Sequence, residues 1–348
     1  TVNLIVSFKD STESVLESVK EVEFATRGAK ITTLVNRLEA HAATSQASLN
    51  DALDSRARRL EATGVDDNSN QLYESKTSLW VSNQVFFKAA TLELVELLSS
   101  LASVSTIHED MRFPLSPATS AANVSNLEAA TLNTWGINMI GAPDVWTKGY
   151  TGQGVVVGTI DSGVFGNHRD LKSNFRADHG WLDPFTLVPF PQDVGGHGTH
   201  VTGTIAGANG IGVAPGAKWI ACRACVDACD YSAIIVCAQF MMCPTDPNYT
   251  NKDCSKAAHV VSSSWGFGQG DTSFQASANA WHAAGIIPVF SIGNDGPACG
   301  TAHSPGDLRE VIGVGGTNGN DDQYTYTGKG PAVTGAMKPD ISAPGQDV

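Results

Sequence analysis

Glycine is distributed so unevenly along this chain that its two ends must fold differently. Of the 35 glycines among 348 residues, only Gly28 and Gly64 precede residue 136. Glycine permits tight turns and close backbone approach, so a region rich in it can contain many such features. We therefore expect two unlike domains that meet near residue 136, and the length of the chain also favours two domains.

Acidic residues outnumber basic ones. The chain has 35 Asp and Glu against 22 Lys and Arg, which gives a formal net charge of −13. It offers no basic surface to neutralise phosphates or anionic lipid, so we expect neither nucleic acid nor a membrane as a partner. No apolar run approaches the ~20 residues of a membrane-spanning helix. Because the first residue is Thr1, we expect the sequence to begin inside a longer precursor.

Residues 1–113, the N-terminal region, show the patterns of a small α+β domain. Apolar residues alternate in the first strand, and leucines then recur at helical spacing through an alanine- and charge-rich stretch. The resulting order, β-α-β-β-α-β, is the ferredoxin-like arrangement. The expected elements are a strand over 2–8, a helix or helical pair over 31–60, strands over 77–81 and 84–89, a helix over 94–101 and a strand over 104–108.

The next segment, FPLSPATSAANVSN at 113–126, is rich in Pro, Ser and Ala. Such a composition buries little apolar area, so we expect an exposed linker over 114–127 that proteases cut readily. A second domain is then expected over 128–348, which we call the C-terminal region.

Short β-branched runs alternate with helical patterns in the C-terminal region. This alternation predicts an α/β fold, with a parallel sheet covered by helices on both faces. Active sites in such sheets gather at the carboxyl ends of the strands. The expected strands are 155–160, 218–222, 259–264, 286–291 and 311–314, and helices are expected after residue 196, through 234–240 and through 280.

Two candidate catalytic side chains occupy positions that suit acid–base chemistry. Asp161 ends a strand in VVVGTIDSG, and His197 lies in GGHGTHVTGTIAG, where a helix is expected to start. A carboxylate at a strand end can hold an imidazole in one tautomer. We therefore expect an Asp161 oxygen within hydrogen-bonding distance of a His197 ring nitrogen. Asp-Ser-Gly is also a common turn sequence, which leaves a purely structural role for Asp161 as the alternative.

A second histidine, His200, follows three residues after His197 and raises the alternative of a zinc pair. Zinc metalloproteases space their two histidines four residues apart with an intervening glutamate, and neither feature is present. We therefore expect His200 to be a structural residue packed under the helix.

Two further segments follow strands of the same sheet. Asn294, in SIGNDG, comes directly after a buried strand, where its carboxamide N–H could donate to a developing oxyanion. Asn-Asp-Gly is also an ordinary turn sequence. The segment Ser264-Trp265-Gly266 ends another strand, and an extended peptide could pair with such an edge.

All seven cysteines lie between Cys222 and Cys299. The spacing C-x2-C is typical of zinc sites, but these cysteines fall at a strand end, on a helix and around a polar insert, which favours disulfides over metal. Two glycosylation sequons, Asn123-Val-Ser125 and Asn248-Tyr-Thr250, agree with a secreted, disulfide-bonded glycoprotein. Cys299 is the odd cysteine, either free or paired outside this sequence.

Five segments, taken in order along the chain, resemble the motifs of the subtilisin-like serine peptidases. They are IDSG around Asp161, GHGTHVTGTIAG around His197, SSSWG at 262–266, SIGN around Asn294 and KPDISAPG at 338–345. The resemblance covers about residues 126–348 and implies a subtilisin-like parallel-sheet catalytic domain. The N-terminal region resembles the ferredoxin-like, inhibitor-type prosegment that precedes such enzymes, with a helical insertion.

This resemblance implies a role for each candidate residue. Asp161 would orient the imidazole, His197 would act as general base and then acid, and Asn294 would complete the oxyanion hole. The segment Ser264-Trp265-Gly266 would line the non-primed substrate cleft, which the linker is expected to cross. Polypeptides would be the substrates, and the prosegment would serve as inhibitor and folding aid.

The chain also departs from the family. The family's nucleophilic serine lies in a GTSMA-like motif shortly after KPDISAPG, and no such motif occurs up to Val348. We expect the 348 residues alone to be inactive, because the covalent route needs that serine. The stretch GANGIGVAP at 207–215 resembles a shortened form of the family's main calcium loop. We therefore expect no cofactor and no metal ligands, with a structural calcium ion as the alternative that the shortened loop does not support.

The sequence thus predicts a secreted subtilisin-like serine endopeptidase zymogen that acts through an acyl-enzyme. The alternative is a catalytically inert, protease-like binding or inhibitory module, and a reading frame that continues into a GTSMA-like motif would discriminate between the two. A metal-dependent hydrolase that uses His197 and His200 is a third hypothesis, which would require stoichiometric zinc.

Overall fold

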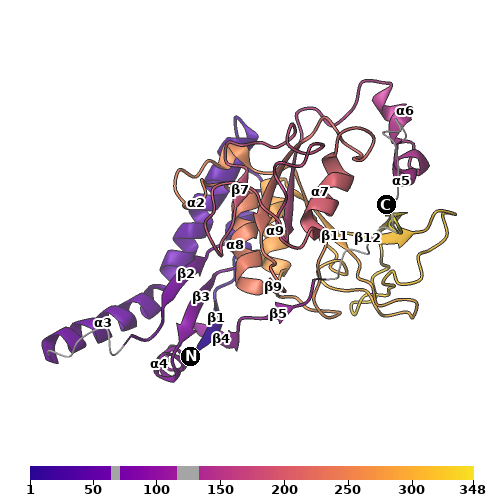
Figure 1. The fold of residues 1–348 in the computed structure, drawn as a ribbon. Helices are drawn as coiled ribbons and strands as arrows, with labels where there is room; N and C mark the ends of the chain where they lie inside the picture. The colour runs from indigo at the N-terminus through magenta and orange to yellow at the C-terminus, as the bar shows by residue number, and fades with distance from the viewer. Residues whose placement is uncertain (64–70, 116–132) are drawn as a thin grey trace.

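The computed structural model describes residues 1–63, 71–115 and 133–348 (Figure 1). These residues form a four-stranded sheet, a seven-stranded sheet and a short two-stranded ladder. Most of the linker expected over 114–127, together with the sequon at Asn123, lies outside the described residues. Among the helices of the described ranges, none is long and apolar enough to cross a membrane.

The N-terminal region forms an antiparallel sheet with the strand order β2-β3-β1-β4, in which β1 pairs with both β3 and β4. This is the ferredoxin-like arrangement that the order of elements predicts. Its elements are β1 (Val2–Phe8), α1 (Glu13–Glu17), α2 (Arg27–Ser45), α3 (Ala47–Thr63), β2 (Ser75–Leu79), β3 (Gln84–Ala90), α4 (Leu92–Ser99) and β4 (Val104–Glu109).

Side-chain caps and apolar spacing explain the helices of this region. The hydroxyl oxygen of Thr26 accepts a hydrogen bond from the backbone N–H of Ala29 at the start of α2, which satisfies one of the free donors there. The helical stretch expected over 31–60 is a pair, because Gln46 separates α2 from α3. One face of α2 is fully buried and carries Ile31, Leu34, Val35 and Leu38.

The C-terminal region contains the seven-stranded sheet, in the order β13-β12-β11-β10-β6-β8-β7. Every neighbouring pair of strands is parallel, so the carboxyl ends of all strands lie along one edge. The strands are β6 (Val156–Asp161), β7 (Trp181–Leu182), β8 (Lys218–Arg223), β10 (Val260–Ser263), β11 (Ile287–Ser291), β12 (Ile312–Thr317) and β13 (Ile341–Pro344).

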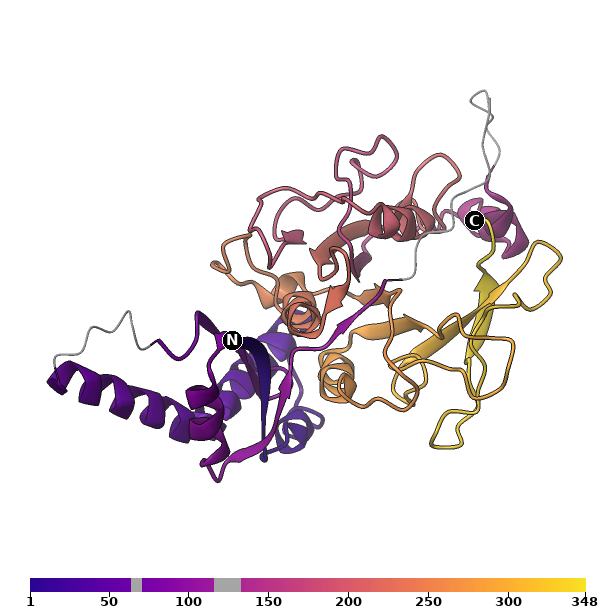
Figure 2. The same cartoon turned by 60° about the horizontal axis from the view of Figure 1, so that its bottom comes forward.

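Helices cover both faces of this sheet, as expected for an α/β fold. Helix α7 (His197–Ala206) lies on one side, and α8 (Tyr231–Met242) and α9 (Gln275–Ala284) lie on the other (Figure 2). Two short helices, α5 (Trp135–Met139) and α6 (Ala142–Trp146), lead into β6. Strand β13 was not expected from the sequence, because its ISAP sequence is too short to show an alternating pattern.

One hydrophobic core joins the two regions. Buried side chains of α1, α2 and β2 belong to the same cluster as those of α8 and α9. From the N-terminal region it contains Leu16, Ile31, Leu34 and Leu79, and from the helices of the C-terminal region it contains Ile235, Phe240 and Trp281. The N-terminal region is therefore packed against α8 and α9.

Six of the cysteines form three disulfides, Cys222–Cys237, Cys225–Cys229 and Cys243–Cys254. The prediction of disulfides is confirmed, and the zinc alternative for these six sulfurs is wrong because each is bonded to another sulfur. Cys299 belongs to none of these bridges and is exposed.

Candidate active site

Asp161 and His197 meet at the carboxyl edge of the large sheet. Asp161 is the last residue of β6 and His197 is the first residue of α7. The Nδ1 atom of His197 lies 2.7 Å from Oδ1 of Asp161, which is the contact that the sequence predicts. The carboxylate side chain is 2% exposed and the imidazole 14% exposed, so water screens this contact little.

The start of α7 approaches the end of β6 very closely. A Cβ atom at Gly198 would lie 2.1 Å from the carbonyl oxygen of Gly163 and 3.0 Å from the Cβ of Asp161. Only glycine therefore fits at this position, which explains the glycine that follows His197. The backbone N–H of Gly198 also donates to Oγ of Ser162 at 2.9 Å, which ties the helix start to the strand end.

Asp193 organises the same helix start, and sequence reasoning missed it. Its Oδ1 accepts hydrogen bonds from Oγ of Ser162 at 3.0 Å and from the backbone N–H of Gly196 at 2.9 Å. Its Oδ2 accepts from the backbone N–H and the hydroxyl of Thr199 at 2.9 and 2.6 Å. An acidic residue just before a predicted helix start is the signal that could have identified it.

Two opposing effects set the pKa of His197. Burial of the ring favours the neutral form and lowers the pKa, but the hydrogen bond to Asp161, its charge and that of Asp193 favour the imidazolium and outweigh burial. The net effect raises the pKa of His197 above its ordinary value of 6.5. This pair can therefore hold a proton on the imidazole while the carboxylate stabilises the resulting charge.

His200 is not a structural residue packed under α7. The residue is exposed, and its Nε2 lies 2.9 Å from the carbonyl oxygen of Val348. The prediction of a packed histidine is wrong because position 200 falls on the solvent face of the helix, where its ring finds a backbone partner. His197 contacts Asp161 instead, so the two imidazoles have different partners.

Asn294 lies three residues beyond the end of β11 and is exposed. Strand β11 is separated from β6 by β10 alone, so the carboxyl ends of β11 and β6 are about 10 Å apart at ~4.8 Å per strand. Asp161, the last residue of β6, and Asn294, three residues after β11, therefore lie at strand ends that share one edge of the sheet.

The segment Ser264-Trp265-Gly266 follows β10 at this edge. Trp265 is buried, and its indole N–H donates to the carbonyl oxygen of Ile160 at 3.0 Å. Any contact of Trp265 with a substrate would therefore use its backbone. Ser264 and Gly266, the residues on either side of Trp265 in the sequence, are half-buried.

A second carboxylate–imidazole pair flanks Asn294, and no local motif predicts it. Nε2 of His303 lies 2.6 Å from Oδ2 of Asp295. The His303 ring packs on the backbone: a Cβ at Gly293 would lie 2.6 Å from its Cγ, and one at Gly266 would lie 3.1 Å from its Cβ. His303 therefore separates the backbone next to Asn294 from the end of the Ser264-Trp265-Gly266 segment.

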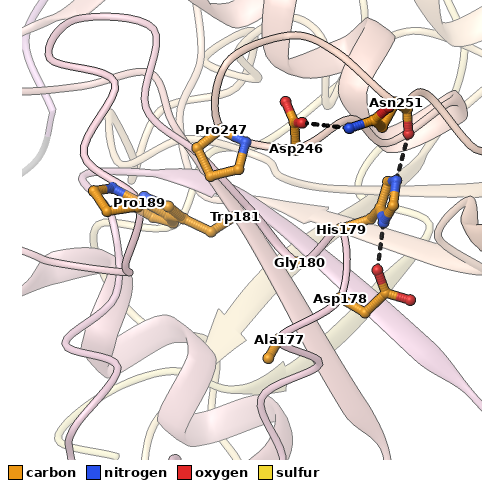
Figure 3. Close-up of a pocket in the computed structure, with 9 residues that line it drawn as sticks. All are labelled: Ala177, Asp178, His179, Gly180, Trp181, Pro189, Asp246, Pro247 and Asn251. Atoms are coloured by element: carbon orange, nitrogen blue, oxygen red, sulfur yellow. Dashed lines mark hydrogen bonds and ion pairs between the residues drawn. The ribbon is translucent and has the colours of Figure 1, made fainter.

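A pocket of about 220 Å³ lies at the opposite edge of the sheet, before the start of β7 (Figure 3). Its polar groups pair with one another: His179 contacts Asp178 and the carbonyl oxygen of Asn251, whose side chain donates to Asp246. Because it adjoins the amino end of β7, it is separate from the edge that carries Asp161.

A calcium ion binds oxygen atoms such as those of carboxylates. Beside the shortened loop at 207–215, the carboxylate oxygens of Asp170 accept hydrogen bonds from protein side chains. The side-chain N–H of Asn209 donates to Oδ1 of the buried Asp170 at 2.7 Å, and Nε of Arg169 donates to its Oδ2 at 2.9 Å. Within the described ranges, no group of three or more His, Cys, Asp or Glu side chains could hold a metal ion. Each oxygen of the Asp170 carboxylate thus already accepts a hydrogen bond from the protein.

One class of serine peptidase has a parallel sheet in which a central strand ends in an aspartate. In that class, the aspartate is hydrogen-bonded to a histidine at the start of a helix. The chain belongs to the subtilase family, whose model matches residues 152–348. The family match includes Asp161, His197 and Asn294 within one continuous span.

Three relatives illustrate the similarity. Bacillopeptidase F of Bacillus subtilis (strain 168) is 34% identical over 287 residues, which is 74% of this chain and 20% of that protein. The subtilisin-like protease SBT6.1 of Arabidopsis thaliana is 32% identical over 220 residues, 61% of this chain and 20% of that protein. Subtilisin E of Bacillus subtilis (strain 168) is 30% identical over 222 residues, 62% of this chain and 52% of that protein.

The chain thus spans about a fifth of the length of the first two relatives and about half of the third. A match over 74% of the chain cannot fit within residues 128–348, so the similarity to bacillopeptidase F extends into the N-terminal region.

Proposed function

We propose that the protein is the precursor of a secreted subtilisin-like serine endopeptidase. The observation that carries this proposal is the 2.7 Å contact between the Asp161 carboxylate and Nδ1 of His197 in a chain of the subtilase family. This contact leaves Nε2 of His197 as the atom that exchanges a proton with a nucleophile.

Each residue then has a role in acyl transfer. Asp161 holds the imidazole in one orientation and stabilises its protonated form. Nε2 of His197 removes the proton from a serine hydroxyl, passes it to the leaving amine, and later activates water to release the acyl group. The carboxamide of Asn294 donates to the oxyanion of the tetrahedral intermediate. The serine comes from a GTSMA-like segment outside these 348 residues.

The N-terminal region acts in this proposal as an inhibitory prosegment. Strand β5 (Arg112–Phe113) pairs antiparallel with β9 (Cys229–Asp230), just beyond the carboxyl end of β8. The Phe113 ring packs against Trp265 and Phe267, with ring centroids 6.2 and 4.7 Å apart. The chain therefore runs beside the Ser264-Trp265-Gly266 segment in the extended form that a substrate would adopt, which supports occupation of the cleft.

A polar contact fixes the approach to this strand. The carboxylate of Asp110 accepts hydrogen bonds from the backbone N–H and the hydroxyl of Ser232 at 2.9 and 2.6 Å, at the start of α8. A carboxylate at a helix N-terminus is favoured because it satisfies free N–H groups and faces the positive end of the helix dipole. Asp110 thus anchors the end of β4 to the C-terminal region.

Secretion and glycosylation belong to the same proposal. Three disulfides suit an oxidising compartment. Asn248 is exposed in the segment that the Cys243–Cys254 disulfide closes, so an oligosaccharide could be attached there without unfolding the loop. A catalytically inert binding module is the alternative, favoured by the packing of Phe113 against Trp265 beside the proposed cleft.

The test compares peptide hydrolysis by the 348 residues with hydrolysis by a chain extended through a GTSMA-like motif. The extended chain should release its N-terminal region and cleave peptides, and Asn294→Ala should lower its kcat about 10²- to 10³-fold with little change in KM. A folded extended chain that cleaves no peptide substrate would favour the inert module.

A further inference from the structure

Helix α2 of the N-terminal region contacts the C-terminal region far from the cleft. It lies against η2 (Cys254–Lys256), a short helical turn that begins at the second cysteine of the Cys243–Cys254 disulfide. Figure 1 shows one end of α2 beside this turn, drawn in orange. We call residues 243–258 the α2 seat.

Backbone carbonyls of the α2 seat receive a guanidinium from the N-terminal region. Nη1 of Arg27 donates to the carbonyl oxygen of Ala257 at 3.2 Å, and its Nη2 donates to that of Ala258. The preceding carbonyl, of Lys256, accepts from Arg176 at 2.8 Å. Ala257 and Ala258 are buried, so their carbonyl groups need these donors.

The packing beside Arg27 is tight. A Cβ at Gly28 would lie 2.8 Å from the Cβ of Ser255 and 3.0 Å from its Cα. This glycine, one of the two that precede residue 136, lets the helix backbone rest directly on the turn.

A third contact lies three helical turns further along the same face of α2, since eleven residues return to nearly the same direction. The two carboxylate oxygens of Glu39 lie 2.7 and 2.6 Å from Nζ of Lys252. Lys252 belongs to the segment that the Cys243–Cys254 disulfide closes.

Hydrogen bonds within the α2 seat, together with one to the last turn of α8, fix its shape. The backbone N–H of Asp253 donates to the carbonyl oxygen of Pro244 at 2.8 Å, and that of Ala258 donates to the carbonyl oxygen of Met241 at 3.0 Å. The Asp253 side chain caps η2 by accepting from the backbone N–H of Ser255 at 3.0 Å. The seat therefore has a fixed shape without requiring α2 to form it.

We propose that the α2 seat is a further docking surface for the N-terminal region, which retains that region through α2 in addition to the shared hydrophobic core and the strand in the cleft. The partner is the chain's own α2, recognised by a guanidinium on carbonyl oxygens, a glycine on Ser255 and a carboxylate on Lys252. The inference rests on the proposed precursor role of the N-terminal region. Two linked sites hold a partner more strongly than either alone, because release of one leaves the other bound.

The experiment uses the full 348-residue chain with a site-specific protease sequence placed within 116–127. After cleavage, dilution and gel filtration follow how fast residues 1–113 leave residues 128–348. Arg27→Ala and Gly28→Leu should each raise the release rate at least tenfold. Phe113→Ala, which removes the aromatic contact at the cleft, should raise it by a separate factor that multiplies with theirs, because distant sites act independently.

The matched control is Lys88→Ala, since Lys88 is exposed and pairs with Glu74 of the same region. If residues 1–113 leave the Arg27→Ala and Gly28→Leu variants no faster than they leave this control, the proposal is overturned.

A charge swap distinguishes loss of a specific contact from unfolding of the variant. Glu39→Lys should raise the release rate about two- to fivefold, the size expected of an exposed ion pair, and adding Lys252→Glu should restore it. Absence of restoration would count against the contact. The release rate is measured without substrate, so it does not depend on whether the protein is a peptidase. An inert module could therefore show the expected changes in release rate. A peptidase that holds its N-terminal region without the α2 seat would not show them.

Discussion

The imidazole of His197 and the carboxylate of Asp161 meet at 2.7 Å although 36 residues separate them in the sequence. Close packing of Gly198 against Gly163 brings the start of α7 to the end of β6, and Asp193 holds that helix start from the other side. The pair is therefore positioned by backbone contacts that do not depend on a nucleophile being present.

His197→Ala should have opposite consequences in two versions of the protein. In a chain extended through the GTSMA-like motif it should abolish nearly all peptide hydrolysis, whereas in the 348 residues it should change nothing, because a general base has no hydroxyl to deprotonate there. Initial rates on a peptide substrate provide the measurement. His200→Ala is the matched control, since that residue is exposed on the same helix. Hydrolysis by the 348 residues that His197→Ala stops would reveal an unrecognised nucleophile within them.

The pH dependence of the extended chain should reflect the raised pKa of His197. The neutral imidazole is the active base, so kcat/KM should fall as the pH decreases through a value above the ordinary 6.5. Asp161→Asn should lower kcat about 10⁴-fold, because it removes the carboxylate that orients the His197 imidazole and stabilises its protonated form. A pH–rate profile checks the first expectation. A midpoint below 6.5 in the wild-type protein would contradict it.

Local sequence patterns predicted much of this architecture, because strands, helix starts and glycine turns depend on nearby residues. The ends of β6 and β11 place Asp161 and Asn294 at one edge for that reason. The pairing of the six bridged cysteines could not be deduced, since six cysteines allow 15 connectivities. Likewise, the contact of Phe113 with Trp265 joins residues far apart in sequence.

His200 shows where local motifs fail. With a zinc pair rejected, a packed structural residue was the expectation, but the direction of a helical residue depends on which face the sheet covers. His303 was missed for a related reason: its contacts with Gly293 and Asp295 arise only when the chain folds back on itself after Asn294.

Limited proteolysis of the 348 residues should cut first between Phe113 and Leu127. The Pro-, Ser- and Ala-rich composition of this segment offers little apolar area to bury, whereas α2 presents a fully buried face. Mass spectrometry of the earliest fragments identifies the site. First cuts within residues 31–60 would argue against an independent, docked N-terminal region.

Asp110→Asn should reduce the pH dependence of stability. Burial raises the pKa of Asp110, although its hydrogen bonds from Ser232 oppose the effect. A carboxyl with a raised pKa in the folded state favours folding below its ordinary value of 3.8, and this contribution is lost as the pH rises through the folded-state pKa. Urea unfolding between pH 3.5 and 7 should therefore show a smaller loss of stability in Asp110→Asn than in the wild type. Asp51→Asn, at an exposed position, is the control for removing one carboxylate from the surface.

Removal of calcium should leave the thermal stability unchanged, because protein donors already satisfy both carboxylate oxygens of Asp170. We expect the same Tm with excess EDTA and with millimolar CaCl₂. Asn209→Ala should instead lower the Tm, since it leaves a buried carboxylate oxygen without its donor at a cost of about 1–3 kcal/mol. The exposed Asn320→Ala variant is the control and should melt with the wild type. A fall in Tm on adding EDTA to the wild-type protein, reversed by calcium, would show that an ion stabilises the fold despite the shortened loop.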